Sequence, residues 1–218
     1  MRIIFPALTL IAALAAPAAR AHPHIFIDTG LEVIFDTQGR ATAVRVTWTY
    51  DDFYSLLMIE DRKLDADYDG KLTPEEEAQL AGFDMDWDAD YNGDLFVLAG
   101  DFQVPLSRPS DFTATYVDGR ITSTHLRSFT EPLVPGAPLV IQVYDPGYYT
   151  AYFIAGQPVL TGAADTCTVQ VYEPDRAAAD ARLTAAIAEM GASGSLEMDF
   201  PAIGSAYAEE ARVTCANG

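Results

Sequence analysis

The residues best suited to binding an ion form an acidic run at residues 65–76, which reads DADYDGKLTPEE. Aspartates occupy its first, third and fifth positions, glycine its sixth and glutamate its twelfth. An EF-hand loop needs these residue types there, because alternating carboxylates surround the calcium ion, glycine permits the turn and the last glutamate binds through both oxygens. The spacing therefore predicts a calcium site with ligands from Asp65, Asp67, Asp69, the carbonyl of Lys71, Thr73 and Glu76.

A second interpretation of this run requires no ion. Thr73 is followed by Pro74 and, three positions on, by Glu76, which is the pattern of a capping box at a helix start. Residues 65–70 would then form an aspartate-rich turn. We favour the calcium site, with a structural role, because capping a helix does not require three alternating aspartates. A further acidic run at residues 84–94 lacks the final glutamate and is interpreted as a solvated loop.

Histidine is scarce in this sequence, and two of the three, His22 and His24, flank Pro23. If a leader is cleaved before His22, that residue offers an α-amine and an imidazole, and His24 adds a second imidazole. These nitrogen ligands suit Zn²⁺, Ni²⁺, Co²⁺ or Cu²⁺, although Pro23 has no N–H to lose and excludes the amino-terminal copper motif. His125 is a third candidate ligand. The alternative is a solvated amino terminus, with His125 on a strand surface.

The chain begins with the layout of a secretory signal peptide, residues 1–21. A positive start precedes an apolar run at residues 3–16 and an A-x-A cleavage site that ends at Ala21, with a competing cut after Ala18. The apolar run is too short for a stable membrane span. We therefore expect export to the periplasm and a single mature domain, residues 22–218, with no membrane-inserted segment.

The charge balance limits the partners of the mature chain. The full sequence has 13 Lys and Arg against 32 Asp and Glu; without Arg2 and Arg20, 11 basic residues remain and the net charge is −21. Such a surface repels nucleic acid and attracts cations. Cys167 and Cys215 are the only cysteines, and in an oxidising compartment we expect a disulfide, with a thiolate metal site as the alternative.

Hydrophobic periodicity predicts the elements that position these residues. Helices are expected over residues 52–63, from residue 74 and over residues 174–190, the first with Asp51 as its N-cap and an apolar face of Phe53, Leu56, Leu57 and Met58. Strands are expected over residues 25–35, 41–50, 112–117, 120–129, 139–144, 149–154 and 166–172, with a two-residue hairpin turn at Asp118-Gly119 and another turn at residues 145–148. The sum is a β-rich α+β fold: an antiparallel, sandwich-like domain with an EF-hand-like helix–loop–helix inserted at about residues 52–83 and a C-terminal helix.

Three motifs together resemble one bacterial family, the domain of unknown function 1007 family. They are HPHIFID at residues 22–28, the acidic loop at residues 65–76, and YDPGYY at residues 144–149 with a cysteine after it. The resemblance implies an exported, periplasmic component of a transport system, associated with nickel/cobalt-type permeases of the inner membrane and, in some members, with zinc uptake. The long histidine-rich stretches of some zinc-uptake members are missing here. What carries over is His22, His24 and the acidic loop.

Enzyme motifs are absent from the sequence: it has no Gly-x-Ser-x-Gly, no phosphate-binding glycine loop and no His-Glu-x-x-His. We therefore expect a non-enzymatic protein. Combined with the candidate metal ligands, the family resemblance implies an accessory that binds or delivers a transition metal to an inner-membrane transporter, with a structural calcium loop. An adaptor domain stabilised by calcium, with no transition-metal role, is the first alternative. A copper redox protein is the second.

Overall fold

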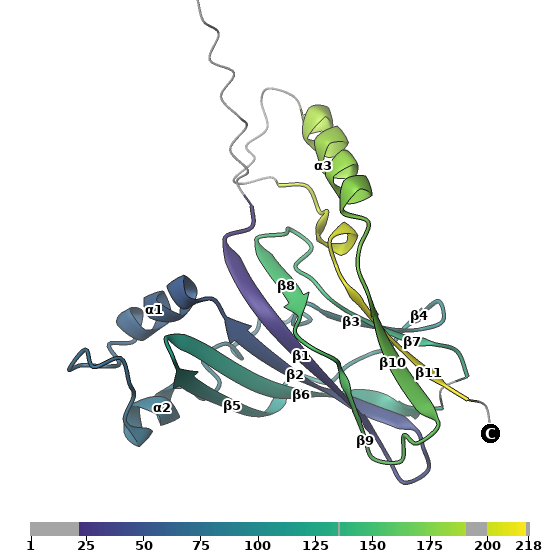
Figure 1. The fold of residues 1–218 in the computed structure, drawn as a ribbon, viewed down its shortest axis with the longest axis horizontal. Coiled ribbons are helices and arrows are strands. Elements are labelled where there is room, and N and C mark those ends of the chain that lie inside the picture. Colours follow the sequence, from purple (N-terminus) through teal and green to yellow (C-terminus); the bar gives the residue numbers. More distant parts are fainter. Residues whose placement is uncertain (1–21, 135, 191–199, 217–218) are drawn as a thin grey trace, which may run out of the picture.

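The computed structural model describes residues 22–134, 136–190 and 200–216, which form two β-sheets with helices at their periphery (Figure 1). The two sheets share one apolar core. The first sheet has the strand order β5-β6-β2-β1-β8, and β9 also pairs with β1. Its strands are β1 (Ile25–Phe35), β2 (Ala41–Tyr50), β5 (Ser110–Val117), β6 (Arg120–Leu133), β8 (Thr150–Ile154) and β9 (Val159–Thr161). The β-rich α+β fold class expected from the sequence is confirmed.

The second sheet has the strand order β10-β11-β7-β3-β4. Its strands are β3 (Leu95–Ala99), β4 (Phe102–Gln103), β7 (Leu139–Val143), β10 (Cys167–Tyr172) and β11 (Glu210–Cys215). Val97, Ile141 and Val213 of this sheet are buried in the same core as Val33 and Val44 of the first sheet. Burial of these apolar side chains between two alternating faces is what holds the sheets together.

Local sequence signals account for the two hairpins of the first sheet. From Ile27 in β1 and from Val44 in β2, every second residue is buried, as a half-buried strand requires. The turn between β5 and β6 is Asp118-Gly119, and both residues have positive φ, 51° and 80°. That combination defines the tight turn whose twist matches two antiparallel strands.

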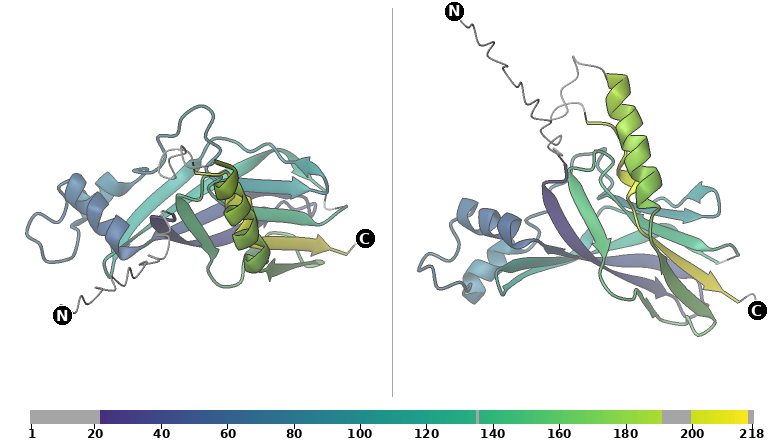
Figure 2. Two further views of the ribbon diagram at one scale, coloured as in Figure 1. Left: turned by 90° about the horizontal axis from the view of Figure 1, so that it is seen from above. Right: turned by 45° about the horizontal axis from the view of Figure 1, so that its top comes forward.

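The helices lie at the periphery of the sheets. α1 (Asp52–Asp61) and α2 (Pro74–Leu80) follow β2 and flank one end of the first sheet (Figure 1), where they contact β6 and β5. α3 (Arg176–Met190) and the short helix η2 (Gly204–Ala206) lie between β10 and β11 in the chain. α3 projects away from the sheets (Figure 2, right) and buries only Ala179 among its described residues. None of the helices in the described parts of the chain is long and apolar enough to cross a membrane.

The N-cap of α1 is confirmed, but its predicted apolar face is wrong. The Asp51 carboxylate accepts a hydrogen bond from the Tyr54 N–H at 2.8 Å. Of that face, Phe53, Leu56 and Leu57 are at least half exposed and only Met58 packs against the core, whereas Ser55 and Ile59 are buried. The small serine faces β6 because the Ile121 N–H of that strand donates to its Oγ at 2.9 Å.

The turn at residues 145–148 does not form a hairpin. It carries the chain from β7 in the second sheet to β8 in the first, where β8 pairs with β1 in parallel. The short strand β9 also runs parallel to β1, further along the same edge. The expected antiparallel architecture therefore has one edge of parallel pairing, which brings the start of β8 next to the start of β1.

Candidate functional site

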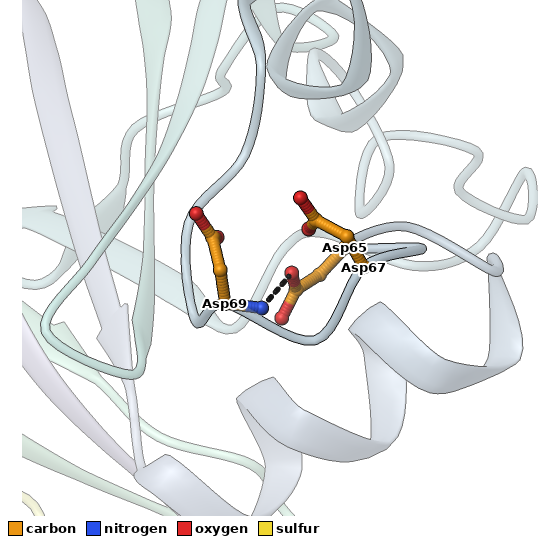
Figure 3. Close-up of side chains that lie close together, drawn as sticks. All are labelled: Asp65, Asp67 and Asp69. Atoms are coloured by element: carbon orange, nitrogen blue, oxygen red, sulfur yellow. Dashed lines mark hydrogen bonds between the residues drawn. The ribbon is translucent and has the colours of Figure 1, made fainter.

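The acidic loop connects α1 to α2 and gathers its first three carboxylates. One oxygen from each of Asp65, Asp67 and Asp69 lies within 4.8 Å of the others (Figure 3). Ligands on opposite sides of a calcium ion lie about 4.6–5.2 Å apart, because each Ca–O distance is about 2.3–2.6 Å. The three aspartates therefore have a spacing that fits one calcium ion.

Backbone hydrogen bonds shape this loop around Asp65. Its two carboxylate oxygens accept from the N–H groups of Asp69 at 3.0 Å and Gly70 at 3.1 Å, and Gly70 has the positive φ of 78° that the sharp turn needs. The Lys71 N–H donates to the Asp69 carboxylate at 2.9 Å. The glycine of the sixth position thus has the conformational role that the spacing predicted.

Glu76 forms a capping box with Thr73 at the start of α2, as the interpretation without a calcium ion predicts. Its Oε2 accepts from the N–H and the hydroxyl of Thr73, both at 2.9 Å, while the Thr73 hydroxyl accepts from the Glu76 N–H. These bonds hold the pKa of the Glu76 carboxyl below its usual value. Oε1 accepts weakly from the Ala66 N–H at 3.5 Å, so the carboxylate reaches the opening residues of the loop. Both interpretations are therefore compatible with this geometry.

His22 and His24 lie together just before β1. Their ring centroids are 5.0 Å apart, and the Tyr149 ring lies 4.7 Å from that of His24. The His24 N–H donates to the Tyr149 carbonyl at 2.8 Å, an arrangement made by the parallel pairing of β1 with β8. His22 is only 8% exposed, and neither of its ring nitrogens has a hydrogen-bond partner in the described residues. The Phe200 ring covers it at 4.1 Å.

The fold does not bring His125 to this pair. His125 is opposite Val46, and Val46 is opposite Leu31, nine residues along the chain from His22. His125 is fully buried between the rings of Trp48 and Trp87, at centroid distances of 4.7 and 5.5 Å. Burial, and then the charge of Arg127, lower its pKa to about 3, so the imidazole is neutral. Among the described residues the only group of three metal-ligating side chains is that of Asp65, Asp67 and Asp69.

The buried face of β6 is unusually polar, and sequence reasoning missed it. Ser123, His125 and Arg127 follow one another on that face and are at most 4% exposed. Buried polar side chains normally need hydrogen bonds, yet both ring nitrogens of His125 have none within the described chain. The alternation S-x-H-x-R-x-F shows that these three polar residues share one side of the strand with Phe129, but it does not show that this side is the covered one.

The acidic run at residues 84–94 covers this polar face, so its interpretation as a solvated loop is wrong at both ends. Asp84 accepts from the hydroxyls of Ser123 and Tyr50, and the Trp87 ring packs over His125 and Arg127. Asp94 is 6% exposed, whereas the aspartates in the middle of the run are exposed. Trp87 is buried between its exposed neighbours Asp86 and Asp88, so the run contacts the fold at Asp84, Trp87 and Asp94 and exposes the aspartates between them.

The predicted disulfide between Cys167 and Cys215 is present, with an S–S distance of 2.00 Å. The two residues are directly opposite each other on β10 and β11. No free cysteine remains in the described residues, so a thiolate metal site is wrong. A disulfide fits an oxidising compartment.

The chain belongs to the DUF1007 family, proteins of unknown function, whose sequence profile matches residues 7–215. The match covers nearly the whole chain, in agreement with the resemblance carried by the three motifs. No curated protein matches the sequence.

Proposed function

We propose that this protein is an exported, periplasmic metal-binding accessory that holds a transition metal at His22 and His24 and passes it to an inner-membrane transporter of the nickel/cobalt type. The proposal includes no catalytic step. Calcium in the loop at residues 65–76 has a structural role in it. The strongly acidic surface supports a cation as the ligand, since 32 acidic residues raise the local concentration of cations.

The observation that carries the proposal is the spacing of the two imidazoles. Two imidazoles on one tetrahedral zinc ion have ring centres about 5 Å apart, because each nitrogen lies about 2.0–2.1 Å from the metal. The rings of His22 and His24 are 5.0 Å apart, and the nitrogens of His22 have no competing hydrogen bond in the described part of the chain. Cleavage after Ala21 would add the α-amine of His22 as a third nitrogen ligand.

Calorimetric titration with Zn²⁺, Ni²⁺, Co²⁺ and Cu²⁺ tests this site, using protein that begins at His22. We expect one ion per chain, and weaker binding as the pH is lowered because protons compete for the ligand nitrogens. Retaining Ala21 should weaken binding sharply, since it converts the amine into an amide. Equal affinity for the two forms would show that the amine is not a ligand.

Histidine variants complete the test. His24→Ala should abolish tight binding, whereas His125→Gln should leave it unchanged, because His125 is buried elsewhere in the first sheet. Circular dichroism of both variants controls for folding. Unchanged affinity when both His22 and His24 are replaced would refute the proposed site.

A calcium-stabilised adaptor is the second candidate, favoured by the exposed side of α1. Phe53 is 73% exposed, and Leu56 and Leu57 are each about half exposed, next to a loop with the spacing of a calcium site. Exposed apolar groups of this kind are used in protein contacts. Calcium-dependent stability without any transition-metal binding would favour this candidate over the first.

A further inference from the structure

A pocket of about 450 Å³ opens beside the polar face of β6, away from both proposed metal sites. Its walls come mainly from the segment before β3 and from residues 103–108, which run from the end of β4 toward β5. Its volume lies in the range of pockets that hold small molecules. Trp87, Leu95 and Val104 supply apolar surface, and Arg108 and Arg127 supply two positive charges.

Arg127 is fixed in the wall of this pocket. It is 4% exposed, its Nε donates to the Ser107 carbonyl at 2.7 Å, and its Nη1 donates to the Asn92 carbonyl. The guanidinium lies 4.9 Å from the centroid of the Trp87 ring. Within the described chain, the Nη2 group of Arg127 donates no hydrogen bond. Its N–H groups are therefore available to a ligand.

Arg108 reaches the same tryptophan from a second direction. Its guanidinium lies 5.7 Å from the Trp87 ring and donates to the backbone carbonyls of Trp87 and Asp88. Burial, and then the charge of Arg108, lower the pKa of Arg127 to about 10. The two cations thus repel each other across one pocket.

Neither arginine of the pocket has a carboxylate within 4.0 Å among the described residues, although Asp90 also lines the pocket. Several arginines elsewhere are paired with carboxylates, among them Arg40, Arg45 and Arg120. Within the described residues, a chain with 32 acidic residues therefore leaves both guanidiniums of this pocket without a paired carboxylate. A buried charge without a partner is costly, and an anion bound between the two would remove that cost.

Gly93 packs directly against two of the side chains that line the pocket, Trp87 and Arg127. A Cβ at this position would lie 2.3 Å from the Trp87 ring and 2.7 Å from Nη1 of Arg127. Glycine is thus required at position 93, where φ is 73°, because only glycine lets the loop pack this closely against Trp87 and Arg127. This packing holds the guanidinium in one orientation before any ligand arrives, which favours binding.

We propose that this pocket binds a small organic carboxylate that has an apolar part. A guanidinium fork matches the two oxygens of a carboxylate, and Trp87, Leu95 and Val104 can cover the apolar part. A polyanion is disfavoured, because the whole chain has a net charge of −19 and Asp90 lines the pocket. The proposal is independent of the metal sites.

Calorimetric titration of the mature protein with acetate, benzoate and cyclohexanecarboxylate at millimolar concentrations tests the pocket. Benzoate and cyclohexanecarboxylate should bind more tightly than acetate, and cyclohexylmethylamine, of similar shape but opposite charge, should not bind. No binding of any carboxylate overturns the proposal. Equal binding of the amine, or binding of inorganic phosphate alone, also overturns it.

Variants locate the binding. Arg127→Gln and Arg108→Gln should each weaken cyclohexanecarboxylate binding by about tenfold or more, as loss of a charge-assisted hydrogen bond does. Arg108 is exposed, so its replacement keeps the test valid even if Arg127→Gln fails to fold. Arg62→Gln is the matched control, because Arg62 also lies over an aromatic ring and donates to a carbonyl, those of Phe83. An affinity equal to wild type in Arg108→Gln, or a loss in Arg62→Gln as large as in Arg108→Gln, overturns the assignment.

Discussion

The Asp94 carboxyl group is buried and accepts hydrogen bonds from the hydroxyls of Tyr91 at 3.0 Å and Tyr152 at 2.8 Å. Burial is the largest influence and raises its pKa from 3.8 to about 6. A raised pKa means that the folded protein holds this proton more tightly than the unfolded chain does. The resulting stabilisation is complete below about pH 4 and is lost as the pH rises through about 6.

Replacing Asp94 by Asn should remove this dependence on pH. The free energy of unfolding of the variant, relative to wild type, should rise between about pH 4 and about pH 7 by up to about 3 kcal/mol. Urea denaturation at the two pH values measures it. Asp86→Asn, an exposed neighbour, is the control and should follow wild type. If Asp94→Asn also follows wild type, the carboxyl does not titrate as the structure indicates.

The loop aspartates make a separate prediction about calcium. If Asp65, Asp67 and Asp69 bind the ion, calcium at 100 times its dissociation constant should stabilise the fold by about 2.7 kcal/mol and raise the melting temperature. Asp65→Ala should abolish that rise, and so should Glu76→Ala. Asp88→Ala, in the other acidic run, should keep it. A melting temperature that does not respond to calcium or chelator would contradict the site.

At the scale of single elements, the packing of α1 depends on one small residue. Ser55 is fully buried, and its Oγ accepts from the Ile121 backbone N–H of β6. Ser55→Val should leave that N–H without a partner and destabilise the protein by about 1–3 kcal/mol. Phe53→Ser, on the exposed side of the same helix, should change stability by about 0.5 kcal/mol or less. Chemical denaturation measures the loss of stability in each variant. A larger loss in Phe53→Ser than in Ser55→Val would contradict this packing and support the apolar face expected from the sequence.

The elements that the sequence predicted correctly are those determined by neighbouring residues. The turn at Asp118-Gly119 and the cap at Thr73 involve residues within four positions of one another. Partner strands are different, because the choice of β1 as the partner of β8 and β9 depends on packing between distant segments. No local pattern encodes that choice. The residues of the turn at 145–148 predict a turn, but they do not reveal that it joins strands of two different sheets.

The candidate sites likewise divide into those set by neighbouring residues, which the sequence predicts, and those set by packing between distant segments, which it does not. The acidic loop is a local motif, and its aspartates are grouped as expected. The inward direction of Ser123, His125 and Arg127 was not predictable from β6 alone, because an alternating strand does not reveal which of its faces is covered. Only the packing of Trp87 and its segment on the sheet makes that face interior.

For the whole molecule, the disulfide ties the last strand to its neighbour. Cys167 and Cys215 are 48 residues apart in sequence, and closing a loop of this length contributes about 4 kcal/mol in the chain-entropy model. Replacing both cysteines by serine should lower the free energy of unfolding by about that amount, as measured by denaturant titration. Non-reducing mass spectrometry of the wild type should find the two residues joined. Two alkylatable thiols in exported protein would contradict the bond.

The position of β11 also bears on when the protein can fold. β11 (Glu210–Cys215) is inserted between β10 and β7, although both of those strands precede it in the chain. Until residue 215 is available, β10 has no partner in the second sheet and the inner edge of β7 remains open. A chain threaded through a membrane from its amino end therefore cannot complete its core during transit. If the chain is exported as we propose, its second sheet can therefore be completed only after residue 215 has crossed the membrane.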